Sequence, residues 1–230
     1  MNIVFGEYAF AHLSTLISNY NDFFLLTDDN IYKIYSSLIA SLFPKKEIYK
    51  IVIPSGEDSK SIENVMFIWN KLHESNAGRD SLLINLGGGT ISDIGGFAAS
   101  CYKRGIDFIN VPTTLLAMTD ASIGGKNGIN FRNRKNQIGL FSIPKSIIIN
   151  PFFLKTLPQR DLLSGLAEMM KYAFIADASF FDLNTDNYLD FIEKAATTKD
   201  DIVNLDFKES GLRKMLNFGH TIGHALEAFY

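Results

Sequence analysis

Several features that would point to particular kinds of protein are scarce in this sequence of 230 residues. It has one cysteine, Cys101, and a formal net charge of only −3. One cysteine cannot form a disulfide within the chain, which suits a reducing compartment. Without a basic surplus there is no reason to expect nucleic acid or an anionic membrane as a partner. No apolar run approaches membrane-spanning length, and residues 1–6 do not resemble a secretory signal, so we expect a cytoplasmic protein.

The sequence does contain an ordinary globular composition, with 47% hydrophobic and 20% charged residues, which suits one or two domains. Short apolar runs predict strands at residues 3–5, 23–27, 49–53, 82–86, 108–111 and 146–149. Apolar residues at three- and four-residue intervals predict helices at residues 10–18, 32–42 and 62–73. This alternation indicates a Rossmann-like α/β fold, a mostly parallel sheet with helices on both faces.

The strand signal fades after Pro151, and helical patterns replace it. A short helical turn is expected at residues 152–157, and helices are expected at 162–175, at 188–197 and from 213 onward. The sequence therefore predicts an α/β domain at residues 1–150 and the first part of an α-helical domain at residues 151–230. The final residues keep a helical pattern without a stop signal.

Three consecutive glycines, Gly87, Gly88 and Gly89, follow the predicted strand at 82–86 and precede a segment with helical spacing. Glycine lets the backbone turn sharply and approach a ligand closely, and a helix N-terminus favours an anion. A tight turn without a ligand explains the three glycines equally well, because this is not the GxGxxG fingerprint. Cys101 lies on the apolar side of the predicted helix, so we expect it to be a buried packing residue.

Polar residues follow two other predicted strands, in the segments Asp28-Asp29-Asn30 and Ser55-Gly56-Glu57-Asp58-Ser59-Lys60. Ligands of parallel α/β sheets bind beyond the carboxyl ends of the strands, so both segments and the glycines can face one crevice. A carboxylate there can accept hydrogen bonds from the hydroxyls of a ribose. Taken singly, Asp28, Glu57 and Lys60 are more often solvated loop charges.

The region after the glycines mixes hydroxyls, a carboxylate, lysines and further glycines. It contains Val111-Pro112-Thr113-Thr114, Asp120-Ala121-Ser122-Ile123-Gly124-Gly125-Lys126-Asn127-Gly128 and Lys135-Asn136. Such a mixture of polar and charged residues is unusual in a hydrophobic core but is typical of a site that binds a phosphorylated ligand. The sequence resembles the 3-dehydroquinate synthase family, in which GGGxxxDxxGF, RGI, VPTTLLAxxDxSxGGKxGIN and KNxIGxF occur in this order.

The resemblance implies conversion of 3-deoxy-D-arabino-heptulosonate 7-phosphate to 3-dehydroquinate with loss of phosphate, in the shikimate pathway, with NAD and a zinc or cobalt ion. The NAD contacts that it implies are Asp28, Asn30, Ser55, Gly56, Glu57, Asp58, Ser59, Lys60, Gly88, Gly89, Thr90, Ile91, Ser92, Asp93, Thr113, Thr114, Asp120, Lys126, Lys135, Phe153, Leu154, Lys155 and Thr156. The substrate contacts that it implies are Arg104, Lys126, Asn136, Lys171, Lys199, Glu209, Arg213, Asn217 and His224. Asp120, Lys126, Lys171, Asn217 and His224 would be catalytic, and Arg104 would act across a homodimer.

Two further patterns allow more than one interpretation from the residues alone. Glu168 and Lys171 share one face of a predicted helix, either as a surface ion pair or as buried groups that need a partner or a metal. His220 and His224, one helical turn apart, could bind one metal or have no special role. The resemblance assigns metal binding to Glu168 and His220, and substrate binding to His224.

The chain also departs from the family pattern. The family's third metal-binding histidine lies beyond the position of His224, and no histidine follows His224 here. Phe207 stands where an acidic residue is usual. Members are longer, so the chain resembles an N-terminal portion of the family. The alternatives are another sugar-phosphate cyclase, such as 2-deoxy-scyllo-inosose synthase or a sedoheptulose 7-phosphate cyclase, a polyol dehydrogenase of the same architecture, and an inactive NAD-binding fragment.

Overall fold

The fold is built around a six-stranded parallel sheet. The computed structural model describes residues 1–42, 48–132, 134–220 and 222–223. The strands of the sheet follow the order β1-β8-β5-β4-β2-β3, and every pairing between neighbours is parallel. Their bounds are β1 (Ile3–Phe5), β2 (Phe23–Asp28), β3 (Tyr49–Ile53), β4 (Leu82–Gly87), β5 (Asp107–Pro112) and β8 (Ser146–Ile149). All six coincide with a predicted strand to within one residue at each end.

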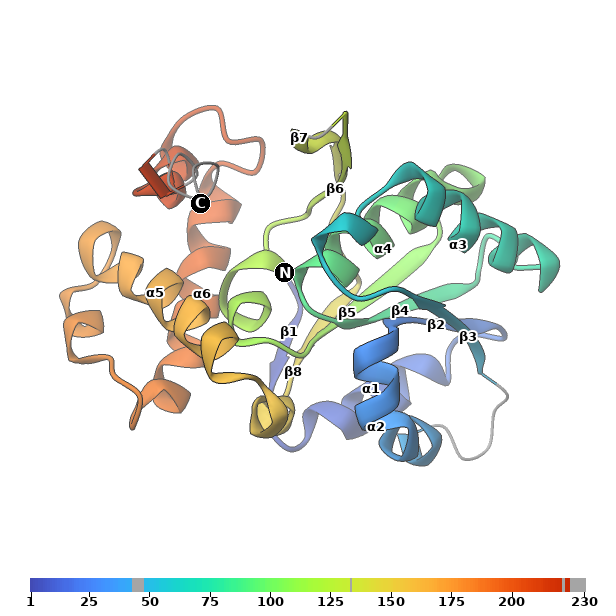
Figure 1. The fold of residues 1–230 in the computed structure, drawn as a ribbon, viewed down its shortest axis with the longest axis horizontal. Helices are drawn as coiled ribbons and strands as arrows, with labels where there is room; N and C mark the ends of the chain where they lie inside the picture. Colours follow the sequence, from blue (N-terminus) through green and yellow to red (C-terminus); the bar gives the residue numbers. More distant parts are fainter. Residues whose placement is uncertain (43–47, 133, 221, 224–230) are drawn as a thin grey trace.

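Helices cover both faces of this sheet, as the alternation of patterns predicts (Figure 1). The α-helices are α1 (Ala9–Ile17), α2 (Asp29–Leu42), α3 (Ile62–Glu74), α4 (Gly89–Cys101), α5 (Gln159–Ile175) and α6 (Tyr188–Leu205). Short helical turns are η1 (Glu57–Ser59), η2 (Tyr102–Arg104), η3 (Ala117–Ala121), η4 (Pro151–Thr156), η5 (Ala178–Asp182) and η6 (Leu212–Asn217). The turn η3 is a π-helix and the other five are 3₁₀-helices.

The strand β2 shows why this sheet is buried on both sides. Phe23 and Leu25 belong to one core with side chains of α1 and α2, whereas Phe24 and Leu26 belong to a second core with side chains of α3 and α4. Successive side chains of a strand point to opposite faces, so a strand with helices on both sides must be apolar throughout. This is why the predicted strands appear as continuous apolar runs.

The helical part of the chain, η4 to η6 (Pro151–Asn217), lies beside the edge of the sheet that β1 and β8 form (Figure 1). Met169 and Tyr172 of α5 and Ala195 of α6 join the same core as α1 and α2. The last strand of the sheet ends at Ile149, and the described elements after Pro151 are helical. The division into domains at residue 151 stays a prediction.

One element differs from the loop-rich region that the sequence suggests after Asp120. Strands β6 (Lys126–Phe131) and β7 (Arg134–Phe141) form a separate antiparallel hairpin. The side chains of β7 are exposed or half-buried along its whole length, so β7 carries no alternation of buried and exposed positions. An alternation of apolar and polar residues arises when one face of a strand is buried. Because neither face of β7 is buried, its sequence shows no such alternation.

Two further expectations are wrong. Cys101 is exposed rather than buried, because it ends α4 where the chain leaves the core. The helix predicted from residue 213 onward begins later: residues 212–217 form the 3₁₀ turn η6, Gly219 follows with a φ of +82°, and His220, Ile222 and Gly223 are helical. No α-helix in the described ranges is both long and apolar enough to cross a bilayer.

Candidate active site

A cavity of about 530 Å³ lies beyond the carboxyl ends of β2, β3, β4 and β5, where the sequence places a ligand. Its walls also include the start of α4 and the turn η4. The predicted NAD contacts that line it are Asp28, Asn30, Ser55, Gly56, Glu57, Lys60, Gly88, Gly89, Thr90, Ile91, Asp93, Thr113, Thr114, Lys135, Phe153 and Thr156.

The glycines at the start of α4 provide space rather than an unusual backbone conformation. Neither Gly88 nor Gly89 has a positive φ. A Cβ at Gly88 would lie 3.2 Å from Thr114 Cγ2, and a Cβ at Gly89 would lie 3.0 Å from the Cβ of Ala121. Bare backbone therefore faces the cavity at a helix N-terminus, where the unpaired N–H groups and the helix dipole favour an anion.

The volume of this cavity and the bare helix start at Gly88 and Gly89 fit a dinucleotide. Thr113 also lines the cavity, but it is only 2% exposed and its hydroxyl oxygen has almost no accessible surface. A ligand would therefore not reach this oxygen without a shift of the cavity wall.

Of the two acidic residues predicted to face the ribose, Asp28 is buried and Glu57 is exposed. Asp28 is the last residue of β2, and its carboxylate accepts from the N–H of Ile31 (2.8 Å) at the start of α2. Burial raises the pKa of Asp28. Glu57 accepts from the Thr90 hydroxyl (3.2 Å) and from the Asn130 amide (3.1 Å). The predicted loop at residues 28–30 is therefore a strand end joined directly to a helix.

Lys60 lies at the wall between this cavity and a second one. Its ammonium group donates to Asp93 (2.7 Å) and to Asn136 (2.5 Å), and the side chain is only 4% exposed. Burial raises the pKa of Asp93 to about 6, although the neighbouring Lys60 opposes this change. The carboxylate is therefore held in a place that disfavours its charged form.

The second cavity, of about 500 Å³, adjoins the first, because Asp93, Ala121 and Asn136 line both. Its walls come from η3, from the hairpin β6–β7, and from α6 and η6. The predicted substrate contacts that line it are Lys126, Asn136, Lys199 and Arg213. The cavity is also lined by the carboxylates of Asp93 and Asp120, so three cations face two anions. The small excess of positive charge, next to a dinucleotide-sized cavity, suits an anionic small molecule.

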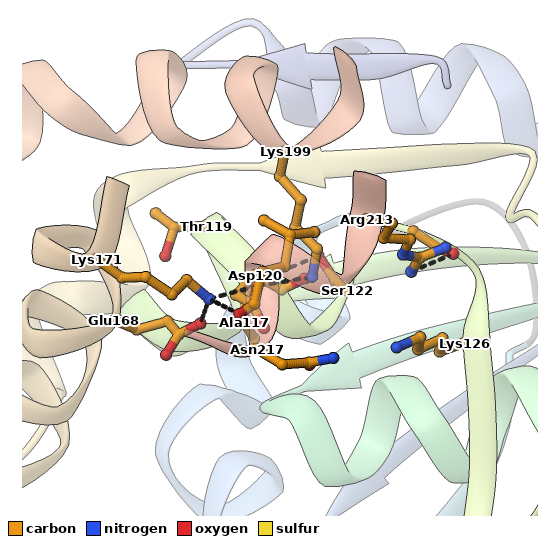
Figure 2. Close-up of polar contacts among 12 residues, drawn as sticks. Ala117, Thr119, Asp120, Ser122, Lys126, Glu168, Lys171, Lys199, Arg213 and Asn217 are labelled. Atoms are coloured by element: carbon orange, nitrogen blue, oxygen red, sulfur yellow. Dashed lines mark hydrogen bonds and ion pairs between the residues drawn. The ribbon is translucent and has the colours of Figure 1, made fainter. Parts of the chain in front are cut away.

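Asp120 is the centre of the charges beside the second cavity. Its carboxylate lies 2.8 Å from the ammonium nitrogen of Lys199 and 4.0 Å from that of Lys171 (Figure 2). Burial acts to raise the pKa of Asp120, but Lys199, Lys171 and His220 outweigh it, so the pKa lies below its usual value. Burial lowers the pKa of Lys199, and Asp120 opposes this shift.

Arg213 and Lys126 are held by different partners. The guanidinium of Arg213, which is buried, donates to the carbonyl oxygens of Gly124 (2.9 Å) and Phe207 (2.6 Å). Lys126 pairs with Glu209, whose other oxygen accepts from the Asn217 amide (2.8 Å). The ring of Phe207 packs on Phe141 of β7 at a centroid distance of 5.4 Å, so an aromatic contact stands where an acidic residue was expected.

The model for the N-terminal part of 3-dehydroquinate synthase matches residues 50–164, and the model for its C-terminal part matches residues 165–230. The chain belongs to the 3-dehydroquinate synthase family. A 3-dehydroquinate synthase of Alkaliphilus metalliredigens is 41% identical over 98% of this chain and 67% of its own length.

Solved structures of related cyclases share the fold. A 2-deoxy-scyllo-inosose synthase complexed with carbaglucose-6-phosphate, NAD⁺ and Co²⁺ is 25% identical, with a TM-score of 0.89 over 98% of this chain and 67% of its own. A 2-epi-5-epi-valiolone synthase of Streptomyces hygroscopicus with NAD⁺ and Zn²⁺ bound is 29% identical, with a TM-score of 0.84 over 95% of this chain and 65% of its own. The chain spans 67% of the Alkaliphilus relative and only 54% to 61% of several others.

Of the residues to which the resemblance assigns metal binding, Glu168 and His220 both lie in the described ranges. Glu168 pairs with Lys171, which is buried and also donates to the Leu216 carbonyl (2.8 Å), so this is not a surface ion pair. His220 lies near enough to influence Asp120, and His224 falls outside the described residues. Within the described ranges, no three His, Cys, Asp or Glu side chains form a metal cluster. These residues therefore do not complete a metal site by themselves.

Some predicted contacts lie away from the first cavity. Asp120 and Lys126 line the second cavity instead. Ser59, Ser92 and Leu154 are buried in the fold, Asp58 faces the hairpin end, and Lys155 is exposed. Arg104 follows α4 and precedes the inner strand β5, so it lies toward the amino ends of the strands, opposite the carboxyl ends. It does not reach either cavity of its own chain.

Sequence reasoning missed the residues that the hairpin contributes to the second cavity. They are Asn127, Gly128, Gln137, Gly139, Leu140 and Phe141. All six lie inside the runs GGKxGIN and KNxIGxF, and those two motifs are the signal that could have identified them. It also missed the apolar walls of the first cavity, including Ile31, Ile34 and Leu116.

Proposed function

We propose that this chain carries the dinucleotide site and much of the substrate site of a 3-dehydroquinate synthase. The reaction converts 3-deoxy-D-arabino-heptulosonate 7-phosphate to 3-dehydroquinate with loss of phosphate, in aromatic amino acid biosynthesis. The observation that carries the proposal is the pair of adjoining cavities that share Asp93, Ala121 and Asn136. One is glycine-lined at a helix start, and the other is lined by Lys126, Lys199 and Arg213.

The related cyclase structures bind NAD⁺ with Co²⁺ or Zn²⁺, and we propose NAD and one of these metals here. When bound, NAD would supply reversible hydride acceptance and the metal would polarise substrate oxygens. Glu168 and His220 are the two metal ligands proposed in the described residues, and a further ligand has to come from outside them. The first cavity fits NAD through the bare backbone at Gly88 and Gly89, where a helix begins.

The protein's own residues would mainly bind and orient the substrate. Lys126 and Arg213 are proposed to present cations to a phosphate and a carboxylate. The guanidinium of Arg213 is buried and already donates to two carbonyl oxygens, so its main contribution would be its positive charge at the cavity wall. Asp120, with its pKa below the usual value, stays ionised and can accept a hydrogen bond from a substrate hydroxyl. Lys171, Asn217 and His224 are proposed to orient the same hydroxyls or to transfer protons.

Arg104 is proposed to bind the substrate phosphate in the partner of a homodimer. It lies toward the amino ends of the strands, away from both cavities of its own chain. A cytoplasmic location is proposed from the single cysteine and the absence of a secretory pattern at residues 1–6. Multi-angle light scattering tests the dimer: a monomer at working concentration would remove Arg104 from the substrate site.

A second candidate function is another sugar-phosphate cyclase, favoured by the likeness to 2-deoxy-scyllo-inosose synthase. Incubation with each sugar phosphate, NAD and Zn²⁺ or Co²⁺ would separate the two, because each cyclase yields a different carbocycle. A net release of NADH with a polyol would instead indicate a dehydrogenase, since a cyclase regenerates its NAD.

The direct test is calorimetric titration of the protein with NAD. We expect binding by the unmodified chain and weaker binding by Gly88→Ala, whose Cβ would face Thr114 at 3.2 Å. Gly211→Ala is the matched control, because its Cβ would meet nothing closer than 3.8 Å and it lines neither cavity. Failure of the unmodified chain to bind NAD would refute the proposal. Binding without turnover would restrict this chain to the binding part of the reaction.

A further inference from the structure

Two asparagines lie side by side in the centre of the parallel sheet. Asn85 of β4 and Asn110 of β5 are register partners, only 0% and 2% exposed, and the Asn85 amide donates to the Asn110 carbonyl oxygen (2.9 Å). Strands buried on both faces are normally apolar throughout. Burying an amide is unfavourable unless it is hydrogen-bonded, so this pair needs a reason beyond the packing of the sheet.

The pair reaches out of the sheet to the turn that carries Asp120. The Asn110 amide donates to the carbonyl oxygen of Ser122 (3.2 Å). Ser122 closes the π turn η3, because its N–H (3.2 Å) and its hydroxyl (2.7 Å) both donate to the Ala117 carbonyl. Asp120 and Ala121 lie between these two ends, and Figure 2 shows Asp120 with Ala117 and Ser122 beside it. Isolated π turns are uncommon and occur often at functional sites.

Helix α4 leaves room for this arrangement. A Cβ at Gly95 would lie 2.0 Å from Asn85 Oδ1, a distance that real atoms do not tolerate. Asn85 Oδ1 has no hydrogen-bond partner within the described part of the chain. The Asn85 side chain therefore contributes through the hydrogen bond that its amide donates to Asn110. A glycine inside a helix is unfavourable, and here it accommodates the buried amide.

The end of η3 forms a wall common to both cavities. Ala121 lines both, and its Cβ is the atom that a Cβ at Gly89 would meet at 3.0 Å. Ala121 therefore packs against the backbone start of α4, where the dinucleotide is expected. A small displacement of Ser122 would move Ala121 in one cavity and Asp120 in the other.

We propose that Asn110, supported by Asn85 and by the space at Gly95, is a positioning residue. It fixes the exit of the π turn so that Ala121 and Asp120 take their places at the dinucleotide and substrate cavities. The inference rests on the proposed function for the identity of the ligand, NAD, but the fixing of the turn does not depend on it. Outer residues that orient binding groups are often as important as the groups themselves.

The test compares Asn110→Leu with the double variant Asn85→Leu/Asn110→Leu. In the single variant, the Asn85 amide loses its acceptor and remains buried, so both stability and NAD affinity should fall. In the double variant both amides are gone, and replacing both partners by apolar groups can be nearly neutral. We therefore expect its unfolding midpoint to recover while its dissociation constant for NAD stays about tenfold above that of the unmodified chain.

Hydrogen exchange supplies a readout that needs no ligand. The double variant should lose amide protection at residues 117–123 while β4 and β5 keep theirs. Thr27→Val is the matched control: it removes a buried hydroxyl from the same sheet, one without a hydrogen bond to any described residue, and should change neither readout.

Unchanged exchange at residues 117–123 in the double variant would overturn the inference, as would recovery of NAD affinity together with stability. If the unmodified chain fails to bind NAD, the proposed function falls, and hydrogen exchange still decides whether Asn110 fixes the turn.

Discussion

Asp93 offers a quantitative test of the electrostatics between the two cavities. Burial raises its pKa from 3.8 to about 6, against the pull of Lys60. The folded state therefore holds this proton more tightly than the unfolded state does. Stability from the protonated carboxyl is fully present below pH 3.8 and is lost as the pH rises to about 6. At about 1.4 kcal/mol per pKa unit, the loss is about 3 kcal/mol.

Asp93→Asn removes this titration and retains a neutral side chain of the same shape. The difference in free energy of unfolding, variant minus unmodified chain, should therefore increase by about 2.5 kcal/mol between pH 4 and pH 7.5, because the unfolded carboxyl is already partly ionised at pH 4. Urea unfolding at four pH values measures it, followed by the fluorescence of Trp69, the only tryptophan, whose indole donates to the Ala98 carbonyl (2.9 Å). Glu74→Gln, at an exposed helix end, is the control. A difference that stays flat across this range would refute the reasoning.

Three shorter predictions follow from other contacts. Gly95→Ala should destabilise the protein by about 1–3 kcal/mol, and should be better tolerated in an Asn85→Ala background, because the clash at 2.0 Å disappears; thermal unfolding of the double-mutant cycle measures the coupling. Tyr35→Phe removes the hydroxyl that donates to the Phe153 carbonyl (3.1 Å), so we expect about 1 kcal/mol lower stability in urea unfolding. Cys101 is exposed, and the partial burial of its thiol raises its pKa. It should therefore react with a disulfide reagent in the native state, at a rate that still increases above pH 9.

The main sheet could be predicted because its strands are buried on both faces. Residues such as Leu83 and Ile84 of β4 belong to different cores, yet both are apolar, so the whole run is visible in the sequence. The order of the strands in the sheet cannot be predicted from these apolar runs. Pairing of β1 with β8 joins residues more than 140 positions apart, and no local pattern encodes that contact.

The sequence predicted many of the residues that line the candidate site. It did not predict how their side chains contact one another. The run of motifs identified Lys60 and Asp93, but not that they bind each other with Asn136 in a buried wall. The hairpin escaped prediction because β7 has no buried face. Asn85 and Asn110 also interrupt apolar runs without any motif, and only the fold brings their side chains together.

The buried charges around Asp120 allow a last prediction about what the fold maintains before any ligand binds. Lys199 donates to both the carboxylate and the carbonyl oxygen of Asp120, and Lys199→Met would leave that carboxylate with Lys171 at 4.0 Å. Removing one partner of a buried pair costs about 3–5 kcal/mol, mostly from the charge left behind. Asp120→Asn/Lys199→Met should therefore cost less than the sum of the two single variants.

Urea unfolding of all four proteins measures this coupling, and additive effects would contradict it. Replacement of a buried ion pair by neutral groups is often harmless to stability. If the double variant unfolds like the unmodified chain, the ion pair is not needed for the fold. Its charges would then be explained by what they do at the cavity wall, and loss of substrate binding with an intact fold would be the expected consequence.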